Sequence, residues 1–134
     1  MHPATPPISG IRAFRPFLPA KDFETSLRFY QALGFHAHPL GQTLAELSLG
    51  PHAFLLQDYY VKEWAKNFVM HVLVDDVHSW WQHFHSLHLP DQFSVSPPLP
   101  PRAEPWGLTV AYLFDPVGVL WHFAQPTASV ENAR

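Results

Sequence analysis

Apolar residues recur at helical spacing in two segments of the chain, and each segment begins just after an aspartate. Asp22 and Asp76 are suitable N-cap residues, because a carboxylate accepts hydrogen bonds from the free N–H groups of a first helical turn. Gly34 follows the first segment, as glycine often does where a helix ends. The pattern predicts two amphipathic helices, with apolar positions at Phe23, Leu27, Tyr30 and Leu33 and at Val77, Trp81, Phe84 and Leu87.

Short apolar runs around the first helix predict strands. Residues 13–22 have strand character, with prolines that confine hydrogen bonding to one edge. Residues 43–49 and 53–58 predict two further strands joined by a Gly-Pro-His turn, and a short added strand is expected near residues 36–39. The first half of the chain therefore has the order β-α-β-β, or β-α-β-β-β with the added strand.

The same order recurs in the second half. Residues 68–76 predict a strand before the second helix, and residues 108–114 and 119–125 predict two strands after it. The halves align with an offset of 54 over strand and helix and of 65 over the closing hairpin. The proline-rich residues 90–105 absorb the difference, and we expect them to form a long loop that covers a site or contacts a partner.

Strand alternation assigns residues to the two faces of these sheets. One face of each sheet should pack against the helices. These covered residues are Phe14, Leu18, Phe54, Leu56, Met70, Val72, Val119, Trp121 and Phe123. The opposite faces should together line one concavity. The residues expected there are Arg15, Phe17, Ala53, Leu55, Gln57, Val69, His71, Leu73, Leu120 and His122.

Composition narrows the range of functions. The chain has 134 residues, which suits a single domain, and contains no cysteine, so disulfides, zinc-thiolate sites and cysteine nucleophiles are excluded. A mild net charge of -3 with no basic cluster argues against a nucleic-acid partner. No segment has the long apolar run of a membrane helix or the pattern of a signal peptide, so we expect a soluble cytoplasmic protein. Eleven Phe, five Trp and four Tyr fill a core or line a ligand cavity.

Three stretches together resemble one protein family, and they lie at residues 18–35 (LPAKDFETSLRFYQALGF), 72–81 (VLVDDVHSWW) and 105–125 (PWGLTVAYLFDPVGVLWHFAQ). Their order and the internal repeat are similar to the vicinal oxygen chelate superfamily of glyoxalase I, extradiol dioxygenases, fosfomycin-resistance proteins and bleomycin resistance proteins. The resemblance implies an α+β fold in which two tandem βαβββ modules form a half-barrel cleft, with homodimerisation common.

The domain boundaries follow from the repeat and this resemblance. A single domain is expected over residues 11–126, with module 1 at about 11–62 and module 2 at about 65–126. Residues 1–10 are expected to be a flexible N-terminal tail, and residues 127–134 a C-terminal tail.

Metal-dependent members of this superfamily hold their ion at four equivalent positions. Transferred to this sequence, those positions are Arg15, Gln57, Val69 and His122. Val69 has no donor atom and the Arg15 guanidinium repels a cation, so the set is poor. A shifted site of Gln57, His71 and His122 remains as a weaker alternative. We therefore expect no cofactor, with a divalent metal as the alternative.

Within the superfamily, the chain most resembles the bleomycin resistance proteins, through the segment RPFLPAKD, through Trp106 and Gly107, and through the imidazole of His122. The first hypothesis is therefore a metal-free binding protein, a homodimer that holds or sequesters an aromatic or cationic small molecule between aromatic rings. Glu46 and Glu104 could add negative charge, although each is more often a solvated carboxylate. Arg15 could hold an anionic group or pair with an acid across the sheet. The expected ligand-binding residues are Arg15, Phe17, Gln57, His71, Trp106, Tyr112 and His122.

Two enzymatic hypotheses stay open beside it. One is a metal-dependent glyoxalase or dioxygenase, a lyase or an oxygenase in which the ion polarises two substrate oxygens. The other is metal-free acid–base catalysis with His122 or His71 as the base. The metal-dependent hypothesis lacks the acidic ligand that such enzymes place near His122. The metal-free hypothesis has no paired carboxylate or activated nucleophile to support it, so no catalytic residue is assigned.

Overall fold

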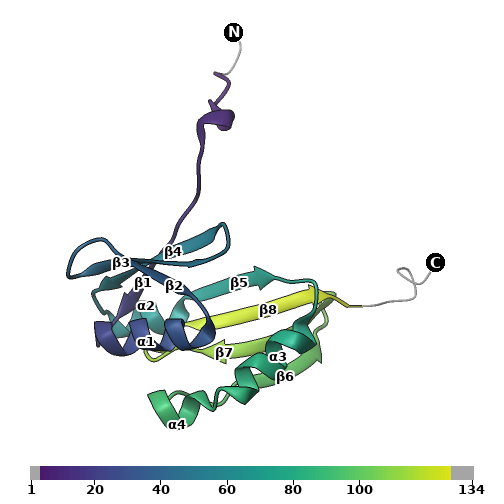
Figure 1. Ribbon diagram of the computed structural model, residues 1–134. Helices are drawn as coiled ribbons and strands as arrows, with labels where there is room; N and C mark the ends of the chain where they lie inside the picture. Colours follow the sequence, from purple (N-terminus) through teal and green to yellow (C-terminus); the bar gives the residue numbers. More distant parts are fainter. Residues whose placement is uncertain (1–3, 128–134) are drawn as a thin grey trace.

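The computed structural model describes residues 4–127, and within them the chain forms two α+β modules in succession (Figure 1). The first contains β1 (Phe17–Ala20), α1 (Phe23–Leu33), β2 (His36–Pro39), β3 (Leu44–Leu49) and β4 (His52–Asp58). The second contains β5 (Val69–Leu73), α3 (Val77–Ser86), α4 (Leu89–Phe93), β6 (Leu99–Ala103), β7 (Leu108–Phe114) and β8 (Leu120–Pro126). Helix α2 (Lys62–Asn67) connects the modules, and a 3-10 turn η1 (Ile8–Gly10) precedes them. None of the helices in this range is long and apolar enough to cross a membrane.

Both predicted helices are confirmed, and both begin after the predicted aspartate. The Asp22 carboxylate accepts a hydrogen bond from the Thr25 backbone N–H at 3.2 Å. The Asp76 carboxylate accepts bonds from two backbone N–H groups and from the Ser79 hydroxyl, the last at 2.7 Å. These bonds lower the pKa of both carboxyl groups. Gly34 ends α1 with a φ of 115°, a left-handed conformation that glycine adopts without strain.

The two sheets have the same topology, which confirms the predicted repeat of βαβββ modules. The strand orders are β1-β4-β3-β2 and β5-β8-β7-β6. In each sheet the first strand of the module pairs in parallel with the last, and the remaining neighbours are antiparallel. Both sheets are open, so each has two edge strands.

The prediction of a long loop over residues 90–105 is wrong, because this segment contains most of α4 and all of β6. Pro90 lies in the first turn of α4, where a backbone N–H has no partner in the helix. Pro100 and Pro101 lie in β6, an edge strand that needs hydrogen bonds on one side only. The prolines therefore mark an edge strand and a helix start.

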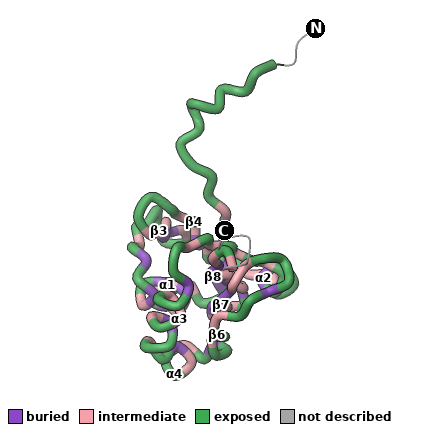
Figure 2. The backbone as a smooth tube through the Cα atoms, turned by 90° about the vertical axis from the view of Figure 1, so that its right-hand side faces the viewer, coloured by how far each residue is buried: buried purple, intermediate pink, exposed green. Residues whose placement is uncertain are grey.

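One hydrophobic core joins the two modules. The rings of Phe54 on β4 and Trp121 on β8 have centroids 5.4 Å apart, and Tyr30 of α1 is 5.7 Å from Trp121. Figure 2 shows α1, α3 and α4 along one side of the molecule and β6, β7 and β8 along the other. The predicted covered faces are confirmed by the buried side chains of Leu18, Phe54, Leu56, Val119, Trp121 and Phe123.

An N-terminal arm precedes the two modules. Residues 4–14 form this arm and extend away from the folded body (Figure 1). Phe14, predicted to face the helices, is exposed because it lies in this arm. The predicted C-terminal tail at residues 127–134 lies outside the described residues apart from Thr127.

Candidate functional site

A row of aromatic and polar rings crosses the open face of the second sheet. His71 of β5 and His122 of β8 are register partners on parallel strands, and their ring centroids are 5.9 Å apart. Tyr112 of β7 is the register partner of His122 on its other side, with ring centroids 5.0 Å apart. Because register partners project from the same face, the second sheet brings together three of the predicted ligand-binding residues.

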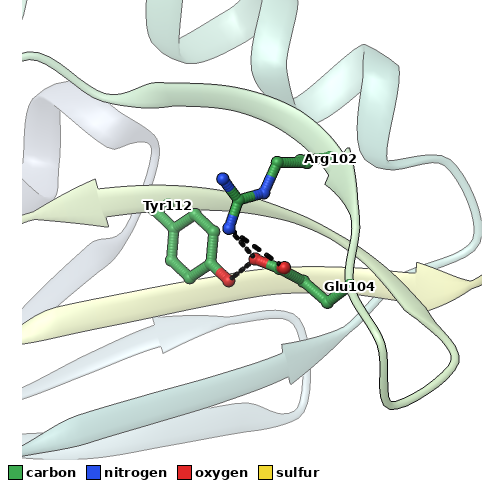
Figure 3. Close-up of polar contacts among 3 residues, drawn as sticks. All are labelled: Arg102, Glu104 and Tyr112. Carbon is green, nitrogen blue, oxygen red and sulfur yellow. Dashed lines mark hydrogen bonds and ion pairs between the residues drawn. The ribbon is translucent and has the colours of Figure 1, made fainter.

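The row continues into a buried carboxylate at the end of β6 (Figure 3). The Tyr112 hydroxyl donates a hydrogen bond to Glu104, and the Arg102 guanidinium donates to both oxygens of the same carboxylate at 3.1 and 3.2 Å. The Glu104 side chain is only 4% exposed, so the expectation that Glu104 is a solvated carboxylate is wrong. Arg102 was not among the residues that the sequence predicted for the site. A register shift in β6 precedes it, and such a bulge has no reliable local signal.

Burial and hydrogen bonding set the protonation states in this row. Burial, together with the bond to Glu104, raises the pKa of Tyr112 to about 12. The Tyr112 hydrogen bond and the Arg102 guanidinium lower the pKa of Glu104. Burial, followed by the neighbouring His71, lowers the pKa of His122. At neutral pH the row therefore presents a phenol, an ion pair and a neutral imidazole at His122, which suits hydrogen bonding to a ligand better than nucleophilic attack.

An apolar hollow lies beside this row. Its volume of about 580 Å³ falls in the range of small-molecule sites. Tyr112 and Arg102 belong both to the hollow and to the polar cluster, so a molecule in the hollow would contact apolar side chains and fixed hydrogen-bonding groups together. The hollow is lined by Leu99, Pro100, Pro101, Arg102, Tyr112, Phe114 and Leu120.

Trp106 lies in the turn between β6 and β7, and its side chain is exposed. The turn is closed by hydrogen bonds from the Gly107 N–H to the Glu104 carbonyl at 3.1 Å and from the Glu104 N–H to the Leu108 carbonyl at 2.8 Å. Gly107 has a φ of 91°, which a side chain would oppose. The turn thus presents an exposed indole two residues from the buried carboxylate.

The other predicted ligand-binding residues belong to the first sheet. Phe17 lies on β1 and Gln57 on β4, both on the face opposite the core. Arg15 precedes β1, and its Nε lies 3.3 Å from the Glu46 Oε2 on β3. Of the two roles considered for Arg15, pairing with an acid across the sheet is therefore the one observed.

Within one chain, the predicted single concave surface is divided between the two sheets. Phe54 and Trp121 meet in the core, so the covered faces are directed toward each other and the open faces outward. Between residues 4 and 127, no hydrogen bond, ion pair or ring contact joins the group of Arg15, Phe17 and Gln57 to the group of His71, Tyr112 and His122.

The candidate metal positions do not form a metal centre in this chain. Arg15 carries a cation that is already paired, and Val69 has no donor atom. In the shifted alternative, His71 and His122 are adjacent but Gln57 lies on the other sheet. Among the residues that the structure describes, no three His, Asp or Glu side chains are grouped so that they could hold a metal ion. Within the described part of one chain, these side chains therefore do not assemble a set of metal ligands.

Comparison with known proteins agrees with this fold. A family model described as the Glyoxalase/Bleomycin resistance protein/Dioxygenase superfamily matches residues 12–123. A search of curated proteins found no match.

Solved structures with the same fold include three proteins of similar length. A bleomycin-binding protein complexed with bleomycin has a TM-score of 0.73 and 24% identity, covering 86% of this chain and 98% of that one. A bleomycin resistance determinant encoded on the transposon Tn5 has a TM-score of 0.73 and 25% identity, covering 87% and 98%. TnmS3, an antibiotic binding protein from Streptomyces sp. CB03234, has a TM-score of 0.68 and 20% identity, covering 88% and 98%.

Proposed function

Because the chain belongs to the glyoxalase/bleomycin resistance protein/dioxygenase superfamily, we propose that it is a homodimer that binds a small aromatic molecule without a metal ion. The observation that carries this proposal is the row of His71, His122 and Tyr112 beside an apolar hollow of about 580 Å³. Apolar walls supply most of the binding free energy, and a few fixed polar groups orient the ligand.

The charges around the site favour a ligand that is neutral or carries one positive charge. Arg102 and Arg15 are each paired with a glutamate, which offsets the positive charge of each guanidinium. The lowered pKa of His122 keeps its imidazole neutral at pH 7. A cationic group would interact favourably with the ring faces of Trp106 or Tyr112.

A second copy of the chain would complete the site. The groups on the first and second sheets lie on separate outward faces, and both faces expose large apolar side chains, including Phe17, Val69 and Leu73. A two-fold dimer that places the first sheet of one protomer opposite the second sheet of its partner would cover these surfaces. Symmetry would then produce two clefts, each with residues from both protomers.

The solved relatives support a ligand of this kind. One is named as a bleomycin-binding protein, one as a bleomycin resistance determinant, and one as an antibiotic binding protein. Sequestration of an aromatic antibiotic would lower its free concentration and confer resistance without any chemical reaction.

Equilibrium titration of the purified protein tests the proposal. Bleomycin, a flat aromatic cation and a neutral aromatic compound are each added while tryptophan fluorescence is recorded. We expect at least one to bind with a Kd below a millimolar, and His122→Ala to weaken that binding by about tenfold, because one oriented hydrogen bond is worth about 1.4 kcal/mol. His78→Ala, on the exposed surface of α3, is the matched control. Failure of all three compounds to bind would overturn the proposal.

The absence of a metal requirement is tested on the same titration. Prior dialysis against a chelator should leave the Kd unchanged. Loss of binding that is restored by a stoichiometric divalent ion would contradict the metal-free proposal and favour the metal-dependent lyase or dioxygenase alternative.

A further inference from the structure

A second hollow is formed by α3, α4 and residues 97 and 98, which lead into β6. Its volume of about 400 Å³ is within the range of small-molecule sites. The second hollow shares no lining residue with the hollow beside Tyr112. Helices α3 and α4 lie along the side of the molecule away from β6, β7 and β8 (Figure 2), so a molecule bound here would not occupy the proposed cleft.

Three aromatic rings follow one another along the wall of the second hollow. The rings of Trp81 and His85 have centroids 5.3 Å apart and planes at 39°. The rings of His85 and His88 have centroids 6.4 Å apart and planes at 48°. Because neither pair is stacked in parallel, each ring leaves part of a face open to the hollow. The face of an aromatic ring attracts a cation, and indole is the strongest of the protein rings in this respect, so this wall is suited to a cationic group.

The charges around the second hollow also favour a cation. Asp91, in the first turn of α4, supplies a carboxylate. The C-terminal end of α3 borders the hollow through His85, and the helix dipole places partial negative charge at that end. No lysine or arginine is among the described residues that line the hollow. A cation placed here would therefore interact favourably with both the carboxylate and the helix end.

The backbone at His88 is strained. His88 has a φ of 51° and a ψ of 47°, and with Ser94 it is one of two residues other than glycine that have a positive φ in the described chain. The five other positions with a positive φ in this range are glycines, which adopt it without strain. The two strained residues flank α4, which is held in place by the buried Leu89 and by Phe93, whose ring is 5.5 Å from that of Phe29. Strain of this kind is typical of ligand sites, and here it accompanies an imidazole in the wall of the hollow.

We propose that the second hollow binds a methylated ammonium group. The rings of Trp81, His85 and His88 contact the methyl groups, and Asp91 balances the charge. A quaternary ammonium spreads its charge over a shell of methyl groups, so it interacts with ring faces and apolar walls and needs no hydrogen-bond acceptor. Three prolines also line the hollow and supply apolar walls that have little conformational entropy to lose on binding. One chain contains the whole site, so binding here does not depend on the proposed dimer.

Titration with choline and with its neutral isostere tests this inference. 3,3-Dimethylbutan-1-ol has the shape of choline with carbon in place of the charged nitrogen, so a difference between the two compounds measures the response to charge. Each compound is added to ¹⁵N-labelled protein while the indole N–H signals of the five tryptophans are followed by NMR. We expect choline to shift the Trp81 signal with a Kd of about a millimolar, and the alcohol to bind at least about tenfold more weakly. Equal binding of the two compounds, or no shift of the Trp81 signal with choline, would overturn the inference.

Two variants test the residues of the second hollow. His88→Gly removes the imidazole and the backbone strain together, so we expect the Kd for choline to rise at least about threefold while the unfolding temperature stays the same or rises. Asp91→Asn removes the counter-charge and should also raise the Kd about threefold, whereas Asp75→Asn, which neutralises an exposed carboxylate elsewhere, should leave it unchanged. If both His88→Gly and Asp91→Asn bind choline as tightly as the unmodified protein, the inference fails.

The position of the shifted signal separates this site from the proposed cleft. Trp81→Phe and Trp106→Phe assign the two indole signals. A shift of Trp81 without Trp106 supports the second hollow. If choline instead shifts Trp106 and leaves Trp81 unchanged, the cation lies in the proposed cleft, so this inference fails while the proposed function stands.

Discussion

The Tyr30 hydroxyl of α1 donates a hydrogen bond of 2.6 Å to the Oδ2 of Asp115, which lies 85 positions later in the turn before β8. Both side chains are buried. The hydroxyl also accepts a bond from Trp121 Nε1 at 3.1 Å, and Asp115 Oδ1 accepts bonds from the N–H groups of Val117 and Val119 at 2.9 Å. This network is a polar connection between the two modules inside an otherwise apolar core.

Removal of the hydroxyl should destabilise the protein. Tyr30→Phe would leave the Oδ2 of Asp115 and the Trp121 N–H each without a hydrogen-bond partner, at a cost of about 1–3 kcal/mol for an unsatisfied buried group. Urea unfolding followed by fluorescence measures the change. Tyr59→Phe, an exposed tyrosine, is the matched control and should change the free energy of unfolding by less than about 0.5 kcal/mol. Equal stabilities of the two variants would contradict a structural role for this bond.

The same carboxyl should make stability depend on pH. Burial raises the pKa of Asp115 to about 6 from an ordinary value of 3.8. The folded state therefore holds this proton more tightly than the unfolded state. The contribution of Asp115 to the free energy of unfolding falls as pH rises from about 4 to about 6, by up to about 1.4 kcal/mol per pH unit, and is constant above that.

Asp115→Asn isolates this effect because asparagine does not titrate. Unfolding measured at intervals between pH 4 and pH 7 should show the unmodified protein gaining about 2–3 kcal/mol relative to the variant as pH is lowered. A difference that stays the same across this range would show that Asp115 has an ordinary pKa in the folded state.

The two helix caps should differ in strength. Asp76 accepts three hydrogen bonds and Asp22 one, so Asp76→Ala should lower the unfolding temperature more than Asp22→Ala does. The lowered pKa of Asp76 means that its stabilisation is complete above about pH 4 and is lost as pH falls through the folded pKa. Thermal unfolding at pH 7 and at low pH measures both effects. Asp75→Ala, which removes a neighbouring exposed carboxylate, is the control, and an equal loss there would refute the capping role.

Tyr112 should control the ionisation of Glu104. Its hydrogen bond is the main cause of the lowered Glu104 pKa, so Tyr112→Phe should raise that pKa. NMR titration of glutamate labelled with ¹³C at the carboxyl group follows the change. Tyr60→Phe removes a hydroxyl elsewhere in the chain. As the matched control, it should leave the pKa of Glu104 unchanged. If the pKa of Glu104 stays the same in Tyr112→Phe, then Arg102 alone sets the ionisation of this carboxyl group.

Mixing two damaged variants tests the proposal that each cleft contains residues from both protomers. If each cleft combines the first sheet of one protomer with the second sheet of its partner, Phe17→Ala and His122→Ala damage different halves of it. An equal mixture, exchanged to equilibrium, should recover about a quarter of the ligand sites, because half the dimers are mixed and each has one intact cleft. Titration with a bound ligand counts the sites. No recovery in an exchanged mixture would place the whole site within one protomer.

The local sequence pattern was sufficient to predict most of the helices and strands. The caps at Asp22 and Asp76, the stop at Gly34 and the covered residues Leu18 and Phe54 follow from hydrogen bonding and spacing over a few residues. The strand β6 was missed because its prolines are typical of a loop, and only its place at the edge of a sheet makes them compatible with a strand.

The sequence by itself determined the two βαβββ modules and the residues on each face of their strands, because helix and strand periodicity are local properties of the chain. Tertiary structure decided how those faces are arranged. The contact of Phe54 with Trp121 turns the open faces outward and divides the predicted site between two sheets. The burial of Glu104 between Tyr112 and Arg102 likewise depends on the pairing of β6 with β7. Neither relationship has a local signature, since each depends on free energy gained only when distant segments pack together.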